Sequence, residues 1–144
     1  MRKYQVMGIF VLCLAVVAHP EPAEASARLN LGGNYWFTKA GVFDLTLALD
    51  TPVVRSFSIG GRAGAAITVD PATAAIPVDF VLRLTVRQFY FEGLLGPWIF
   101  FKGDALRFHG SFGFGLQRKS FLFGIEVGYL DPEPIIGFKI GFRL

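Results

Sequence analysis

Apolar side chains recur at every second position through almost all of residues 28–144. The run Phe43, Leu45, Leu47 and Leu49 illustrates the pattern, and none of the residues on this face is charged in any segment. Because successive side chains of a β-strand point to opposite faces, the alternation predicts strands with one wholly apolar face. No helical period appears in this region. The predicted strands cover 29–37, 43–49, 57–69, 76–86, 89–101, 106–116, 121–129 and 136–144.

The connections between these segments are short and rich in turn-forming residues, which favours antiparallel hairpins between neighbours. Pro77 and Pro97 fall inside predicted strands, and we expect them to mark strand ends or bulges because proline has no N–H for the ladder. The predicted turns lie at 38–41, 51–52, 70–71, 87–88, 102–104, 118–119 and 131–134.

The composition is that of a membrane protein without a membrane helix. Hydrophobic residues make up 53% of the 144 residues and charged residues 17%, against roughly 25% charged in a typical soluble domain. This argues against disorder and against an ordinary soluble enzyme. After residue 27, however, no apolar run approaches the roughly 18 residues that a spanning helix requires. Closed β-barrels are the other structure that can cross a bilayer, because they pair every backbone group internally.

The second face of the strands carries isolated charges among small residues. Its composition indicates which face of the sheet is inside the barrel. Its charges nearly balance in sign, and Gly and Ala fill many gaps, which suits a narrow interior. We therefore expect an all-β, eight-stranded, antiparallel up-and-down transmembrane barrel with its apolar face toward lipid. A soluble periplasmic carrier of lipocalin type, with the apolar face inside, is the alternative fold. The predicted interior polar network comprises Asp44, Arg62, Asp79, Arg83, Glu92, Arg107, Glu126, Lys139 and Arg143.

Residues 1–27 have the order of a secretory signal peptide. Arg2 and Lys3 precede an uncharged, mostly apolar run at 6–18, and small residues follow. The sequence Ala25-Ser26-Ala27 fits the cleavage pattern, as does Ala23-Glu24-Ala25, and we favour a cut after Ala27 with export through the Sec pathway. Residues 28–144 then form one domain that contains no cysteine and hence no disulfide.

The mature chain resembles the small eight-stranded outer-membrane β-barrels of Gram-negative bacteria, the OmpA/OmpX-like architectural class. Its last segment is similar to the C-terminal signal read by the barrel assembly machinery, although that signal usually ends in Phe or Trp. The resemblance implies a monomer in the outer membrane, with lipids and lipopolysaccharide around it, the assembly machinery as partner and both termini in the periplasm. The assembly signal would comprise Phe138, Ile140, Phe142 and Leu144.

One constellation suggests catalysis. His109 and Ser111 share a strand face, where an imidazole can activate a hydroxyl, and Glu126 follows. This resembles the outer-membrane lipid A deacylases, but Phe112 stands where that family has Asn, and the pair falls on the inward face. An interior polar network explains the same residues. No metal-ligand cluster, phosphate loop or dinucleotide fingerprint appears, so we expect no metal or cofactor, and no basic stripe points to nucleic acid.

The expected function is therefore non-enzymatic: a structural role in the envelope, or passage of small or apolar ligands in a porin-like manner. A lipid A deacylase-like hydrolase and the soluble carrier remain the alternatives. An interior of eight strands is only wide enough for its own side chains, which favours a plug over a channel. Aromatic residues near the loop ends, such as Tyr35 and Tyr129, are placed to form a girdle, whereas Trp36 and Trp98 fall on the polar face.

Overall fold

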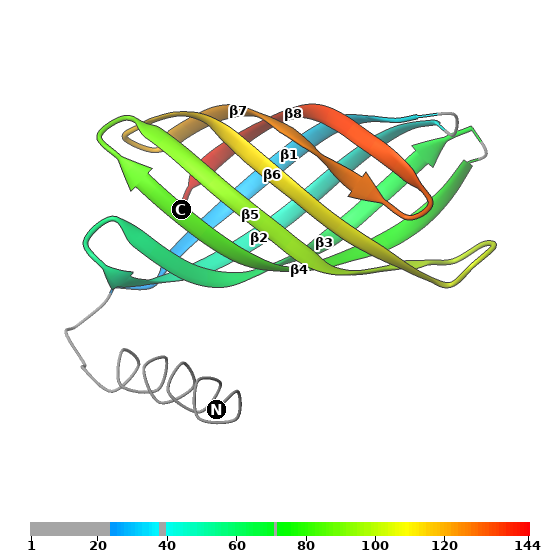
Figure 1. Ribbon diagram of the computed structural model, residues 1–144, viewed down its shortest axis with the longest axis horizontal. Coiled ribbons are helices and arrows are strands. Elements are labelled where there is room, and N and C mark those ends of the chain that lie inside the picture. Colours follow the sequence, from blue (N-terminus) through cyan, green and yellow to red (C-terminus); the bar gives the residue numbers. More distant parts are fainter. Residues whose placement is uncertain (1–23, 38–39, 71) are drawn as a thin grey trace, which may run out of the picture.

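The computed structural model describes residues 24–37, 40–70 and 72–144, which form a closed antiparallel barrel of eight strands in sequence order (Figure 1). The predicted all-β, eight-stranded antiparallel barrel is confirmed. Most of the expected signal peptide lies outside the described residues, while Ser26 and Ala27 are already part of the first strand. The strands are β1 (Ser26–Trp36), β2 (Ala40–Val54), β3 (Phe57–Val69), β4 (Ala72–Val86), β5 (Phe89–Phe100), β6 (Leu106–Arg118), β7 (Phe121–Leu130) and β8 (Glu133–Arg143).

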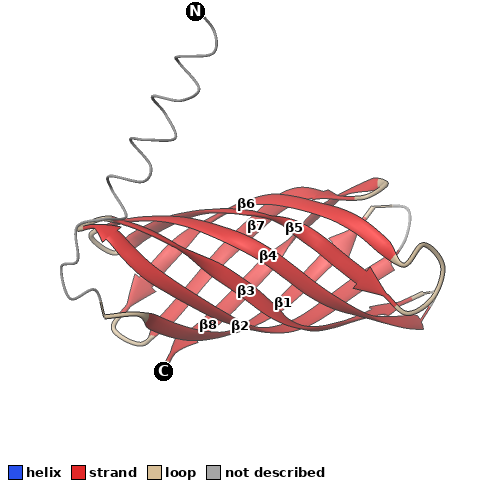
Figure 2. Cartoon of the chain, turned by 90° about the horizontal axis from the view of Figure 1, so that it is seen from below, coloured by secondary structure: helices blue, strands red, loops and turns tan. Residues whose placement is uncertain are grey.

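Each strand pairs with its sequence neighbours, and β1 pairs with β8 to close the sheet. Figure 2 shows the described chain as strands joined by short connections. Closure leaves no unpaired sheet edge, which is the condition for exposing a sheet to lipid. Among the described residues no helix is long and apolar enough to cross a bilayer.

The apolar face of every strand points outward. Leu31 and Phe80 are 54% and 51% exposed, and large apolar side chains of all eight strands are exposed in the same way. The alternate residues point inward, among them Asp44 and Arg62. The soluble-carrier alternative is therefore wrong, because it requires the apolar face to be inside. An outer surface of this kind is suited to hydrocarbon.

Three local predictions need correction. Pro77 and Pro97 neither end their strands nor introduce a bulge, since the β4–β5 pairs Pro77↔Trp98 and Phe80↔Leu95 belong to one register. The predicted turn at 51–52 is instead part of β2, and the register shifts between Pro52 and Val54. A strand tolerates these prolines where a ladder bond is dispensable. The β2–β3 connection lies at Arg55 and Ser56.

The interior has an apolar layer at the end of the barrel opposite the start of β1 and the end of β8, which we call the loop end. The Trp36 and Phe100 ring centroids lie 5.8 Å apart, and those of Trp98 and Phe100 6.5 Å. Trp36 Nε1 donates to the carbonyl oxygen of Leu130 at 2.8 Å, which ties β1 to β7 across the lumen. Aromatic packing of this kind fills the loop end of the barrel. The layer comprises Trp36, Val42, Ala66, Ala75, Trp98, Phe100, Leu130 and Ile135.

Candidate functional site

The middle of the barrel holds a buried network of charges contributed by seven of the strands. Because every second residue of a strand points inward, charges on separate strands converge on one narrow lumen. Such burial is tolerable only where the charges are paired and hydrogen-bonded. Its cations are Arg28, Arg62, Arg83 and Lys139, and its carboxylates are Asp44, Asp50, Asp79, Glu92 and Glu126.

Glu92 on β5 is the centre of one half of the network. Its Oε2 accepts from Nη1 of Arg83 at 2.8 Å and from Nη1 of Arg28 at 3.2 Å. Its Oε1 accepts from Nζ of Lys139. Three cations from β4, β1 and β8 therefore meet on one buried carboxylate. This links strands that are not neighbours in the sheet.

Asp79 on β4 is the centre of the second half. Arg62 donates to Oδ2 through Nε at 3.0 Å and Nη2 at 2.6 Å. His109 Nδ1 lies 2.7 Å from Oδ1, and Trp98 Nε1 donates to the same oxygen at 3.3 Å. The His109 ring also packs on Trp98, with centroids 4.9 Å apart. Asp79 thus joins the charged network to the aromatic layer.

The suspected catalytic pair is not assembled as a nucleophile and its base. Ser111 Oγ donates to Glu126 Oε1 at 2.9 Å, so its hydroxyl is directed at a carboxylate rather than at His109. His109 Nε2 lies 3.5 Å from the same Oε1 atom, and the His109 side chain is 0% exposed. A general base must lie within hydrogen-bond reach of its nucleophile. The geometry matches the interior polar network that the sequence offered as the other explanation.

Glu126 and Asp44 complete the predicted network with different numbers of partners. Glu126 Oε2 lies 3.4 Å from Arg62 Nη1 and 3.5 Å from Lys139 Nζ. Asp44 Oδ2 accepts from Asn34 Nδ2 at 2.9 Å, while its Oδ1 is a buried atom without a hydrogen-bond partner in the described structure. Glu126 is therefore firmly held, and Asp44 is the least compensated carboxylate of the interior.

Two predicted members of the network lie at its ends. Arg143 is exposed at the end of β8 and lines the mouth of the lumen, so it lies at the rim of the network and not in its buried part. Arg107 is half-buried at the loop end, where its guanidinium lies 5.2 Å from the Trp36 ring centroid. It also donates to the carbonyl oxygen of Asp131 at 3.0 Å. Arg107 therefore caps the aromatic layer.

Sequence reasoning missed Arg28, which is only 2% exposed. Its Nη2 and Nε atoms lie 2.7 and 3.1 Å from Oδ1 of Asp50, and its Nη1 reaches Glu92. The alternation did indicate an inward position for Arg28, because it lies two residues before the inward-facing Asn30 and therefore points to the same face. It was overlooked because the predicted strand began at Leu29, close to the expected cleavage position.

The residues of the expected assembly signal lie on and just after β8. Phe138 and Phe142 are exposed on the outer face, and Ile140 is half-buried between them. Leu144 follows the strand and is exposed. Their outward alternation continues the apolar surface of the barrel wall.

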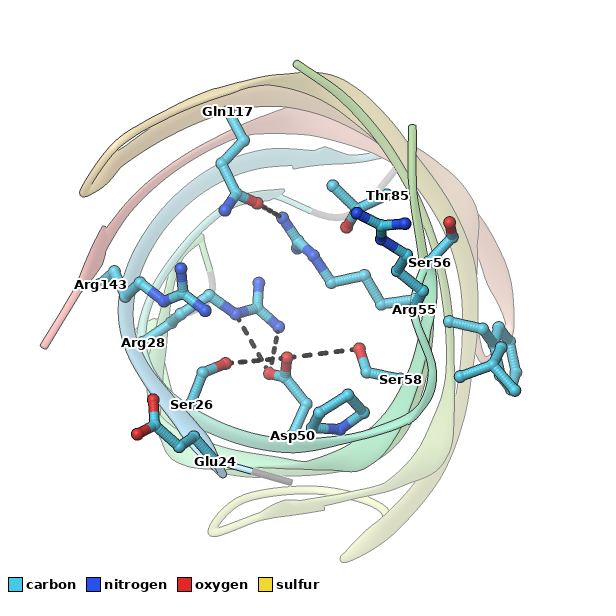
Figure 3. Close-up of a pocket in the computed structure, with 14 residues that line it drawn as sticks. Glu24, Ser26, Arg28, Asp50, Arg55, Ser56, Ser58, Thr85, Gln117 and Arg143 are labelled. Atoms are coloured by element: carbon cyan, nitrogen blue, oxygen red, sulfur yellow. Dashed lines mark hydrogen bonds and ion pairs between the residues drawn. The ribbon is translucent and has the colours of Figure 1, made fainter. Parts of the chain in front are cut away.

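At the end that carries the chain termini, the lumen opens into a cavity of about 230 Å³ (Figure 3). Arg28, Asp50 and Arg83 form its inner part, and Arg55 and Arg143 lie in its lining. The interior therefore has three layers along its axis: an aromatic layer at the loop end, paired charges in the middle and an open polar mouth.

A closed sheet with an apolar outer wall and a filled polar lumen is the architecture of transmembrane β-barrels. The chain matches a de novo designed transmembrane β-barrel with a TM-score of 0.67 and 9% identity, over 87% of this chain and 98% of that one. It matches the N-terminal barrel of Pseudomonas aeruginosa OprF at 0.58 and 11%, over 85% and 99%.

It also matches the Yersinia pestis outer membrane protein Ail at 0.56 and 11%, over 84% of this chain and all of that one. No family model and no curated protein sequence matches the chain. At these identities the likeness shows the fold alone, which is that of outer-membrane barrel proteins.

Proposed function

We propose that this chain is an integral protein of the bacterial outer membrane with a structural, non-enzymatic role in the envelope. The observation that carries the proposal is the filling of the lumen. Trp36, Trp98 and Phe100 pack across its loop end. Behind them, the hydrogen bonds Arg28–Glu92 and Arg62–Glu126 tie opposite walls together, β1 to β5 and β3 to β7. A barrel filled in this way is a rigid body with a lipid-facing wall.

The same filling argues against passage of solutes, the second part of the expected role. Water and ions would have to displace both the aromatic layer and a set of paired charges. Separating a buried ion pair is expensive, because each charge is left without compensation in a medium of low dielectric. The interior therefore supports a closed barrel over a porin-like one.

A lipid A deacylase-like activity is not favoured by the position of its candidate residues. The acyl chains of such a substrate lie outside the barrel wall, whereas His109 is fully buried inside it. Ser111 is also directed at Glu126. An adhesive role, which the name attachment invasion locus suggests for Ail, would need larger loops than the short segments 37–39, 70–71, 101–105 and 131–132.

The partners follow from the proposed location. The chain would be exported through the Sec pathway, inserted by the barrel assembly machinery through its C-terminal segment, and surrounded as a monomer by phospholipid and lipopolysaccharide. No nucleic acid is part of this proposal. The alternating outward residues Phe138, Ile140 and Phe142 on β8 support the insertion step.

Cell fractionation tests the location, and planar bilayers test the closed state. We expect the protein in the outer-membrane fraction, with a gel mobility in detergent that changes on heating, and no regular conductance steps from the wild type. Steps that change in Arg83→Ala would instead support passage through the lumen. Recovery in the soluble periplasmic fraction would overturn the proposed location.

A further inference from the structure

The cavity at the terminal end is unusually rich in arginine. Arg28, Arg55, Arg83 and Arg143 all line it, and they come from β1, the β2–β3 connection, β4 and β8. Figure 3 shows the side chains of Arg28 and Arg143 directed into the opening from the neighbouring strands β1 and β8. Four guanidinium groups therefore surround one small volume.

The carboxylates in the cavity do not neutralise these cations. Asp50 is already engaged, because its Oδ1 accepts from Arg28 and its Oδ2 from Ser26 at 3.1 Å and Ser58 at 3.4 Å. Glu24 is the other lining carboxylate, and it is exposed. Four cations thus face two lining carboxylates, and Glu92, which lies behind Arg28 and Arg83, is shared with Lys139. This leaves an excess of positive charge at the mouth.

Two of the arginines have guanidinium groups available to a ligand. Within the described part of the chain, no hydrogen bond or ion pair joins the side chain of Arg55 or Arg143 to another residue. Arg83 is held by Glu92 and Gln117, so it contributes a fixed charge deeper in the cavity. Neutral donors on Ser56 and Thr85 also line the wall.

We propose that this cavity binds a phosphate group carried by a small anion. The planar guanidinium matches phosphate oxygens with two parallel hydrogen bonds and remains charged at any physiological pH. A cleft of one sign between low-dielectric walls concentrates an oppositely charged ligand. At about 230 Å³ the cavity is smaller than the roughly 300–1,000 Å³ of a drug-sized site, which limits the ligand to phosphate or a compact phosphate ester.

Export cleavage would strengthen the site. Both expected cleavage positions, after Ala25 and after Ala27, follow Glu24 in the sequence. Cleavage at either position removes the Glu24 carboxylate and leaves a positively charged α-amino group on β1 near the cavity. The processed protein is therefore expected to bind phosphate more tightly than a chain that retains Glu24.

The test is titration calorimetry of the processed protein in uncharged detergent micelles. Because the measurement uses purified protein, its result does not depend on where in the envelope the protein resides. Inorganic phosphate and glycerol phosphate are the free ligands. We expect saturable binding that the double variant Arg55→Gln with Arg143→Gln weakens about tenfold, a loss in the range of charged hydrogen bonds. The matched control is Arg87→Gln with Arg118→Gln, which removes the same charge from the same end of the barrel but outside the cavity lining. It is expected to bind as the wild type does.

A second arm identifies the source of the phosphate group. Micelles doped with phosphatidylglycerol compete with free phosphate if a lipid headgroup enters the cavity, whereas phosphatidylcholine is the zwitterionic comparison. Competition by phosphatidylglycerol alone assigns the site to an anionic headgroup, and no competition assigns it to a free phosphate compound. The proposal is overturned if none of these ligands binds saturably, or if the two double variants lose the same affinity. Retention of heat-modifiable mobility verifies that each variant is folded.

Discussion

Arg62 on β3 stands directly opposite Asp79 on β4 in the strand register and donates two hydrogen bonds to its Oδ2 atom, at 3.0 and 2.6 Å. Both side chains are buried inside the lumen. A slip of one strand by one residue would turn its member of the pair toward lipid, because side chains alternate between the faces. The pair therefore links the register of the wall to the filling of the interior.

Replacing Arg62 by leucine is expected to destabilise the barrel by about 3–5 kcal/mol, the usual cost of leaving one partner of a buried ion pair uncompensated. The measurement is the urea midpoint of the protein folded in lipid vesicles. Arg118→Leu at the exposed end of β6 is the control, and we expect it to stay within about 0.5 kcal/mol of wild type. Equal midpoints for the two variants would contradict the structural role of the Arg62–Asp79 pair.

Neutralising Glu92 should cost more stability than neutralising Asp44. The variant Glu92→Gln leaves Arg28, Arg83 and Lys139 around an uncharged amide, whereas Asp44→Asn removes a carboxylate whose hydrogen-bond partner is the neutral Asn34. The same vesicle unfolding assay compares the two changes, which are matched in size and charge. If Asp44→Asn proves the more damaging, Glu92 is not the centre of the network.

Two glycines differ in the space around them: Gly115 lies against a neighbouring backbone, whereas Gly93 faces open space. A Cβ added at Gly115 would lie 2.1 Å from the Phe123 carbonyl oxygen, so that the backbones of β6 and β7 would have to shift. A Cβ added at Gly93 meets nothing within 4 Å. We expect Gly115→Ala to impair folding and Gly93→Ala to be neutral or stabilising by up to about 1 kcal/mol, since glycine weakens a strand interior. The fraction of heat-modifiable protein after refolding measures both, and an impaired Gly93→Ala would refute the argument.

The first residue of the processed protein can be determined by intact mass. β1 begins at Ser26, which pairs with Asp50 and donates to its carboxylate at 3.1 Å. A cut after Ala25 keeps these contacts, and a cut after Ala27 removes them. From the structure we expect processing after Ala25, the second of the two positions that the small-residue pattern allows. A mass corresponding to a chain that starts at Arg28 would instead support cleavage after Ala27.

The period of two was sufficient to predict the barrel, because it reports directly which face each residue occupies. It placed Asp79 and Glu92 on one face and Phe80 and Phe91 on the other, as the structure has them. It was weakest where small residues or proline interrupt the apolar pattern. β4 therefore begins at Ala72 instead of Ile76, and β2 extends to Val54.

The partners within the interior lay beyond the reach of sequence reasoning. Alternation specifies the face of a residue but not its height along the barrel axis or its neighbours across the lumen, which depend on strand tilt and stagger. That Lys139 and Arg28 meet at Glu92 is a consequence of closure between β8 and β1. The exposure of Arg143, the last residue of β8, has the same origin, because it depends on the height at which that strand ends along the barrel axis.

The start of β1 and the end of β8 lie beside the arginine-lined cavity, since Ser26, Arg28 and Arg143 all line it. The loop end, by contrast, is closed by Trp36, Trp98 and Phe100. A domain fused to either terminus would consequently lie over the entrance to the lumen and block access to the cavity. Tags for purification or imaging are better inserted in the 101–105 connection, where they leave that entrance clear.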